Sequence, residues 1–154
     1  MGKNILYLEN DWLWVEDILP QLSEHGLVTP ITSEREFRGT IDLLKRCGNR
    51  FPDAVVLEQR VRWAYPSPDL EISQIPIEVR EHGYLNAGVR CYEYLRNAEK
   101  GSRRTPVIFY SLVEAREITD ILTAKGIRED PKDYQFVDKN GSFGDLHRAL
   151  RRVL

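Results

Sequence analysis

The chain has 154 residues, of which 22 are Lys or Arg and 24 are Asp or Glu, so its formal net charge at neutral pH is −2. Hydrophobic residues make up 42% and charged residues 30%, which is typical of a globular domain and argues against disorder. The near balance of charge disfavours nucleic-acid binding, which depends on many contacts between basic residues and phosphates. Two cysteines are too few for a disulfide scaffold, and no apolar stretch approaches the roughly 20 residues that span a bilayer. We therefore expect one cytoplasmic domain, residues 1–154, with no output domain and no nucleic-acid or membrane partner.

Short apolar runs alternate with helical patterns along the chain, and the first run covers residues 5–8. Residues 54–57 and 107–110 are apolar without alternation, which is typical of strands buried on both faces of a parallel sheet. Residues 135–138 give a weaker strand pattern. Residues 28–31 contain Pro30, so we place that strand near an edge of the sheet.

Helices are predicted between these strands. Apolar residues recur at helical spacing over residues 12–24, where Pro20 is expected to kink or split the helix. The other predicted helices follow Ser33, run around 89–95 and 118–122, and follow Ser142 to the end of the chain. The β-α order, repeated five times, predicts an α/β fold: a three-layer, doubly wound, five-stranded parallel sheet.

Residues 60–86 break this rhythm, with three prolines, mixed charges and isolated apolar residues. Loops longer than about 12–15 residues are uncommon in compact domains and are often functional. The segment leaves the carboxyl end of the third strand, so it is placed to cover a pocket at that edge. Trp, Tyr and Arg commonly anchor protein interfaces, and the segment carries Arg60, Arg62, Trp63 and Tyr65. Two readings stay open: these residues pack back on their own domain, or they dock a partner.

Polar side chains follow the carboxyl ends of the predicted strands: Glu9, Asn10, Asp11, Glu58, Ser111 and Lys139. In an open parallel sheet these positions converge on one crevice. Such a set is suited to a hard cation on oxygen ligands, with the lysine pairing a carboxylate. The structural alternative is that polar residues simply end strands at the surface, and Ser111 with Glu114 also fits a helix-capping box.

Four segments, taken in order, resemble a response-regulator receiver domain (CheY-like). They are residues 3–11, with an acidic pair after the first strand, residues 52–58, residues 105–111 and residues 136–139. The resemblance implies the flavodoxin-like receiver fold over essentially the whole chain. It also implies that Glu58 stands at the phosphoacceptor position, that Ser111 and Phe136 stand at the switch positions, and that Lys139 is the family's lysine.

The departures from the family pattern point to a degenerate receiver, or pseudo-receiver. Receivers carry the phosphoryl group on an aspartate, and the carboxylate of Glu58 lies one methylene further out. A misplacement of about 1 Å can cost on the order of 10²-fold in a geometry-dependent step. Asn10 removes one negative ligand, so any Mg²⁺ bound by Glu9, Asn10 and Glu58 is expected to bind weakly. Leu112 and Asn140 also depart from the family pattern.

We expect a signalling module that acts through protein–protein interaction, without aspartate-type phosphorylation, enzymatic activity or a cofactor. Its partner would be a kinase, an output protein or another receiver, and a mixed-charge face on the last two helices is compatible with a weak homodimer. The first alternative is an active phosphorelay receiver with an atypical acceptor. A flavodoxin-like cofactor or nucleotide binder is a further alternative, which is disfavoured because residues 9–12 contain no glycine to cradle a phosphate.

Overall fold

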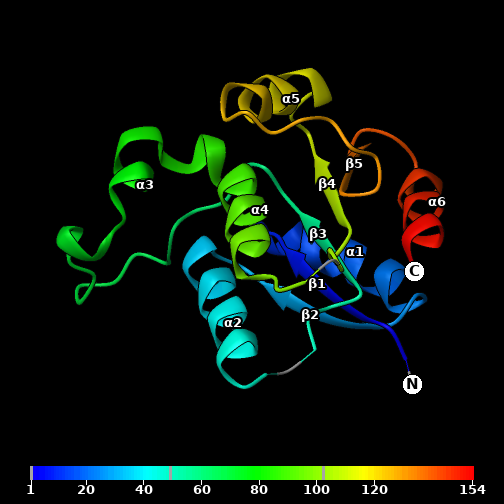
Figure 1. The fold of residues 1–154 in the computed structure, drawn as a ribbon, viewed down its shortest axis with the longest axis horizontal. Helices are drawn as coiled ribbons and strands as arrows, with labels where there is room; N and C mark the ends of the chain where they lie inside the picture. Colours follow the sequence, from blue (N-terminus) through cyan, green and yellow to red (C-terminus); the bar gives the residue numbers. More distant parts are fainter. Residues whose placement is uncertain (1, 49, 102) are drawn as a thin grey trace.

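The computed structural model describes residues 2–48, 50–101 and 103–154. In this part of the chain, strands alternate with helices and form a five-stranded parallel sheet (Figure 1). The strand order is β2-β1-β3-β4-β5. The strands are β1 (Asn4–Leu8), β2 (Leu27–Ile31), β3 (Ala54–Leu57), β4 (Val107–Ser111) and β5 (Tyr134–Asp138). The α-helices are α1 (Trp12–Ser23), α2 (Glu34–Arg46), α3 (Ile77–His82), α4 (Ala87–Ala98), α5 (Ala115–Ala124) and α6 (Phe143–Val153). The predicted doubly wound parallel sheet is confirmed.

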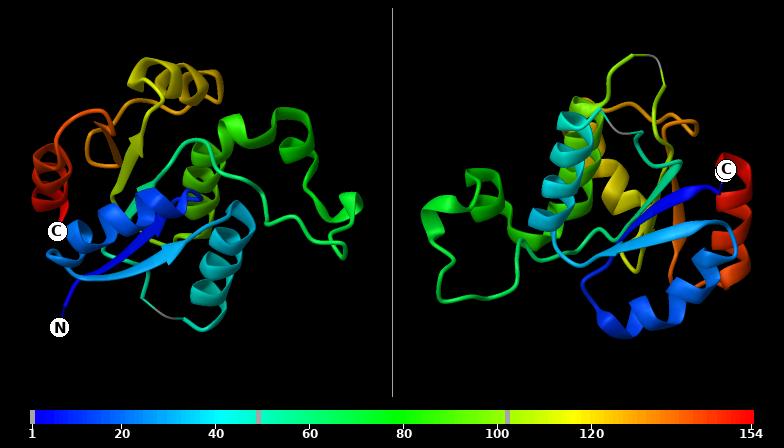
Figure 2. Two further views of the ribbon diagram at one scale, coloured as in Figure 1. Left: turned by 180° about the vertical axis from the view of Figure 1, so that it is seen from behind. Right: turned by 90° about the horizontal axis from the view of Figure 1, so that it is seen from below.

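The core is divided by the sheet into two apolar layers because successive side chains of a strand point to opposite faces. Leu6 and Leu8 pack in a cluster with residues of α2, α4 and α5, whereas Ile5 and Tyr7 pack in a second cluster with residues of α1 and α6. Figure 2 shows these two groups of helices on opposite sides of the strands. This arrangement explains the unbroken apolar runs of β3 and β4, because both faces of those strands are buried.

The two prolines of the sequence argument have different outcomes. Pro30 lies in β2 at an edge of the sheet, paired with Tyr7, as predicted. Pro20 does not split α1, which continues to Ser23. Pro20 is exposed, so the carbonyl oxygen that its missing N–H leaves unpaired can be hydrated. Within the described ranges, no helix combines the length and apolar character needed to cross a membrane.

Within the 60–86 segment, residues 60–71 are irregular, whereas residues 72–86 form short helices. A 3₁₀ turn at Ile72–Gln74 precedes α3, and a second turn at Gly83–Asn86 leads directly into α4. Pro76 stands at the N-cap of α3, a helix of six residues that is too short to show a periodic pattern in the sequence. The segment projects beside α4, on the side of the molecule away from α6 (Figure 1).

Candidate functional site

Four polar side chains meet at the carboxyl edge of the sheet, where the sequence predicted convergence. Glu9 follows β1, Glu58 follows β3, Ser111 ends β4 and Lys139 follows β5. All four are buried, with residue exposures of 2%, 7%, 2% and 5% in that order. Each strand is fixed by its neighbours in the central sheet, so these side chains are held by rigid elements rather than by mobile loops.

Lys139 joins the two carboxylates. Its Nζ donates hydrogen bonds to Oε2 of Glu9 and to Oε2 of Glu58, and both are ion pairs. The Oγ of Ser111 donates to Oε1 of Glu58. The lysine and the hydroxyl group therefore already have carboxylate partners within the protein.

Backbone N–H groups complete the coordination of both carboxylates. Oε1 of Glu58 accepts from the N–H of Gln59 at 2.7 Å and from the N–H of Arg60 at 3.3 Å. Oε1 of Glu9 accepts from the N–H of Asp11 at 3.0 Å. Donors to the charged form of a carboxylate stabilise that form, so the site is built to hold negative charge at these oxygens.

The site nevertheless has an excess of negative charge, with two carboxylates facing one ammonium group. Burial raises the pKa of Glu9, and Lys139 opposes that effect. Burial, reinforced by the charges of Glu9 and Glu58, raises the pKa of the neighbouring Tyr110 to about 12. Burial likewise raises the pKa of Tyr7, whose hydroxyl group is buried without a hydrogen-bond partner among the described residues.

Aromatic rings enclose the ammonium group of Lys139. Its Nζ lies 4.7 Å from the ring centre of Trp14 and 5.6 Å from that of Tyr110. The two rings meet edge to face, with centres 6.3 Å apart. Cation–π attraction strengthens when the cation is shielded from water, so these rings help to hold the ammonium group in its buried position.

The pocket in front of these residues has a volume of about 430 Å³. Its mouth is lined by Asp11, Arg60, Leu112, Val113, Glu114 and Glu117. Arg60 is the one residue of the 60–86 segment that lines the described pocket, so the segment does not cover it. The segment is instead held against α2 and α4, at the side of the site.

No protein-family model matches the sequence, and no curated protein is similar to it in sequence. Solved receiver domains do match its structure. One is the receiver domain of a sensor histidine kinase from Pseudomonas aeruginosa, solved with a magnesium ion in its active-site cleft; it gives a TM-score of 0.63 at 18% identity, covering 99% of this chain and 98% of that one. A response regulator receiver protein from Sinorhizobium medicae gives 0.63 at 18%, covering 99% and 94%. The chemotaxis response regulator CheY4 of Vibrio cholerae gives 0.59 at 14%, covering 100% of both chains.

The chain has the receiver-domain fold. This confirms the resemblance seen in the four sequence segments at the level of the fold. The identities are too low to carry an activity from those proteins to this one, so the chemistry of the site rests on its own residues.

The donor set of this receiver fold suits a magnesium ion poorly. Mg²⁺ needs near-ideal octahedral oxygen ligands, usually carboxylates and water. Here the carboxylates of Glu9 and Glu58 bind Lys139, and the third candidate, Asn10, supplies a neutral amide. Across the described ranges, no group of three or more His, Cys, Asp or Glu side chains is arranged to hold a metal ion.

The aromatic switch candidate lies outside this hydrogen-bonded group. Phe136 belongs to β5 and stacks on Phe109, with ring centres 5.6 Å apart. It packs at the margin of the apolar layer under α2, α4 and α5. The ring is half-buried, and its role as a switch remains a prediction.

Sequence reasoning missed the residues that connect the site to the 60–86 segment. Gln59, fully buried beside Glu58, donates from Nε2 to the carbonyl of Leu85 at 2.9 Å and accepts at Oε1 from the N–H of Val89 at 3.1 Å. A Cβ at Gly88 would lie 2.8 Å from the Cα of Gln59, so only glycine permits this close approach. A single glutamine after a strand belongs to no sequence pattern that would predict this role.

A second buried ion pair was also missed. Arg90, within α4, donates from Nε and Nη2 to the carboxylate of Glu34 at 2.7–3.1 Å, and from Nη2 to the carbonyl of Gly83 at 2.7 Å. Arg38 binds the same carboxylate at 2.7 Å. The one available signal was a charged residue amid the apolar positions of a predicted helix.

The four interaction candidates divide between the two readings. Trp63 packs back on the domain, with the guanidinium of Arg38 lying 5.2 Å from its ring centre. Tyr65 is 52% exposed and stacks on the half-buried Arg62, at 4.9 Å, and Arg60 is exposed at the pocket mouth. Trp63 thus serves as an anchor of the segment, whereas Tyr65 and Arg60 are accessible and Arg62 is partly so.

Proposed function

We propose that this chain is a response-regulator-like signalling module that works through protein–protein interaction, with an internal ion pair in place of a phosphoryl group. The observation that supports it is the bridge of Lys139 between Glu9 and Glu58, with Ser111 bonded to the same Glu58. In the family that the sequence resembles, the lysine and the hydroxyl residue are expected to engage the phosphorylated acceptor. Here a permanent carboxylate occupies them.

The chemistry of Glu58 also argues against phosphoryl transfer. Its Oε1 accepts three hydrogen bonds and its Oε2 binds Lys139, so both oxygens are engaged. Phosphoryl transfer depends almost entirely on positioning and on neutralising charge, usually with a metal ion. The extra methylene of Glu58 and the neutral Asn10 oppose both requirements.

Intact-mass measurement after incubation with acetyl phosphate and Mg²⁺ tests this proposal. We expect the wild-type protein to gain no phosphoryl group. The Glu58→Asp/Asn10→Asp variant shortens the acceptor and restores a second acid, and it serves as the sensitised comparison. A stoichiometric adduct on the wild-type protein would establish the alternative, an active phosphorelay receiver.

The 60–86 segment supplies the accessible surface for a partner. It carries five exposed large apolar side chains: Tyr65, Ile72, Ile77, Tyr84 and Leu85. Beside them a groove of about 540 Å³ is lined by Arg62, Trp63 and Val79, among others, and reaches Asn10 at the site. We therefore infer that a signalling protein, namely a kinase, an output protein or another receiver, docks here.

Binding measurements with paired variants test the docking surface. Once a partner has been captured by crosslinking in cells, Tyr65→Ala/Tyr84→Ala should abolish its binding to the purified protein while circular dichroism stays unchanged. Leu43→Ala, an exposed apolar residue of α2, is the matched control and should bind normally. Equal binding by all three proteins would remove the segment from the interface.

A further inference from the structure

A large cavity lies at the opposite edge of the sheet from the Glu58 site. It has a volume of about 730 Å³ and is formed where β1, β4 and β5 begin and where α6 ends. A volume of this size falls within the range of pockets that hold small organic ligands. Nothing in the proposed signalling function uses it.

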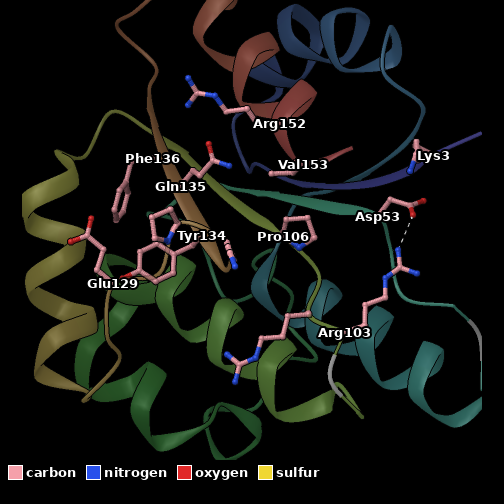
Figure 3. A pocket seen from close by; sticks show the side chains of 13 residues that line it. Lys3, Asp53, Arg103, Pro106, Glu129, Tyr134, Gln135, Phe136, Arg152 and Val153 are labelled. Atoms are coloured by element: carbon pink, nitrogen blue, oxygen red, sulfur yellow. Dashed lines mark hydrogen bonds and ion pairs between the residues drawn. The ribbon is translucent and has the colours of Figure 1, made fainter.

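Basic side chains surround this cavity. Five of them line it: Lys3, Arg103, Arg104, Lys132 and Arg152. They come from four separate stretches of the chain, before β1, before β4, before β5 and at the end of α6. Figure 3 shows Lys3, Arg103 and Arg152 on different sides of the hollow, with Pro106 between them. The chain as a whole carries a net charge of −2, so this grouping is a local reversal of charge.

Two acidic residues, Asp53 and Glu129, line the cavity beside the five basic ones, so the lining keeps an excess of positive charge. Asp53 already accepts a hydrogen bond from the backbone N–H of Asn4 at 2.9 Å and pairs with Arg50, and these contacts hold its pKa below the usual range. Arg103, whose side chain is 72% exposed, reaches Asp53 only at 3.4 Å. Arg104 pairs with Asp133 at 2.8 Å.

Three of the basic residues have no carboxylate partner within the described ranges. Lys3, Lys132 and Arg152 form no ion pair there, and each is exposed. The basic side chains of the lining outnumber its two carboxylates, and an anion that binds among them reduces their mutual repulsion. Arginine adds a planar fork of donors that matches phosphate oxygens.

The floor of the cavity is less polar than its rim. Tyr134 is buried with Pro106 next to it, Val153 lines the cavity from the opposite face of the sheet, and Gln135, on the edge strand β5, presents an amide (Figure 3). No hydrogen bond to a described residue occupies the Gln135 side chain. Such a floor suits the ring or sugar of a ligand whose charged groups lie among the basic side chains.

We propose that this cavity binds a small polyanion carrying two or more phosphoryl groups. Its phosphates lie among Lys3, Lys132 and Arg152, and its organic part, where it has one, lies over Tyr134 and Pro106. The site is independent of Glu58, since it lies at the amino edge of the sheet rather than the carboxyl edge. Inorganic tripolyphosphate and adenosine triphosphate carry the same charged group, and only the second also carries a ring. Comparing their affinities therefore separates a site that recognises the charge alone from one that recognises the charge and a ring.

Isothermal titration calorimetry of the purified chain tests the site at about 50 mM salt, where the screening length exceeds 10 Å. We expect both probes to bind, with one ligand per chain. Lys132→Glu/Arg152→Glu should weaken binding by about tenfold or more. Arg80→Glu/Arg116→Glu is the matched control: it changes the net charge equally at two exposed residues outside the cavity and should leave the affinity within about twofold.

Several results would overturn the proposal. Equal weakening by the two double variants would show attraction to net charge rather than a site. Absence of heat with both probes, or binding only to duplex DNA or to anionic vesicles, would exclude a small polyanion. All substituted residues are exposed, so circular dichroism should confirm that the fold is retained. The phosphodonor experiment on Glu58 reports separately, because it reads a covalent adduct at the other edge.

Discussion

Two buried ion-pair clusters stabilise this molecule, and they are built in opposite ways. In the first, one cation, Lys139, joins two carboxylates at the strand ends. In the second, two cations, Arg38 and Arg90, share the fully buried carboxylate of Glu34 between α2 and α4. The first cluster has an excess of negative charge and opens onto a pocket. In the second, Glu78 of the 60–86 segment also pairs with Arg38, at 3.4 Å, so its charges balance and the segment closes it.

This difference explains why one cluster is suited to switching and the other to anchoring. A carboxylate-rich cluster with one lysine changes its balance of charge when a proton or a partner's cation arrives. The arginine cluster has fewer ways to change, because arginine does not lose its proton near neutral pH and its donors reach the carbonyl of Gly83. We expect the first cluster to determine the conformational state of the domain and the second to hold the 60–86 segment in place.

Removal of the shared cation tests the first cluster most severely. Lys139→Met leaves two buried carboxylates facing each other, which is expected to destabilise the fold by about 3–5 kcal/mol in urea unfolding. The exposed residue Lys45 provides the control, since Lys45→Met should change stability by less than about 0.5 kcal/mol. Part of the loss should be recovered in Glu9→Gln/Lys139→Met, which removes one of the repelling charges. A loss of stability no larger than that of Lys45→Met would mean that the bridge of Lys139 contributes nothing to the stability of the fold.

Arg90→Met tests the second cluster, with a smaller expected effect. Arg38 keeps its contact with Glu34, so the loss should be about 1.5–3 kcal/mol, the range for hydrogen bonds to a charged group. Hydrogen exchange should rise in residues 72–86, because the carbonyl of Gly83 loses its donor. Arg80→Met, exposed on α3, is the control. Unchanged exchange in the segment would contradict the anchoring role.

The same contrast separates what the sequence could predict from what it could not. The strand ends were predictable because parallel strands bring Glu9, Glu58 and Lys139 to one edge whatever the details of packing. Glu34 and Arg90 are distant in sequence and belong to two different helices, so their pairing depends on how α2 and α4 pack. The fold of residues 60–86 was missed for a related reason, since its short helices are stabilised by contacts with the domain more than by their own periodicity.

Trp63→Ala probes the anchor from the side of the segment. The ring is half-buried and stacks on Arg38, so its loss should cost about 1–2 kcal/mol from lost apolar burial and cation–π attraction. The expected result is a lower urea midpoint together with faster exchange in the segment. Tyr65→Ala, whose ring is largely in solvent, is the comparison and should leave the midpoint nearly unchanged. If Tyr65→Ala proved as costly as Trp63→Ala, the division between anchor and accessible residues would be wrong.

The smallest expected effect lies outside both clusters, at the contact between His25 and His147. Nε2 of His25 lies 2.6 Å from Nδ1 of His147, which requires at least one ring to be neutral. Burial, then His147 and Arg151, lowers the pKa of His25, and Glu24 opposes them.

A histidine with a lowered pKa in the folded state stabilises the fold above its ordinary pKa of about 6.5 and loses that contribution as the pH falls through this value. Urea unfolding should therefore show falling stability from about pH 7.5 to about pH 5.5, a range in which histidine is the side chain that normally titrates. The dependence of stability on pH should become flatter in His25→Gln/His147→Gln. An identical pH dependence in this variant would mean that other groups cause it, and the carboxylates of the Lys139 cluster would be the next to test.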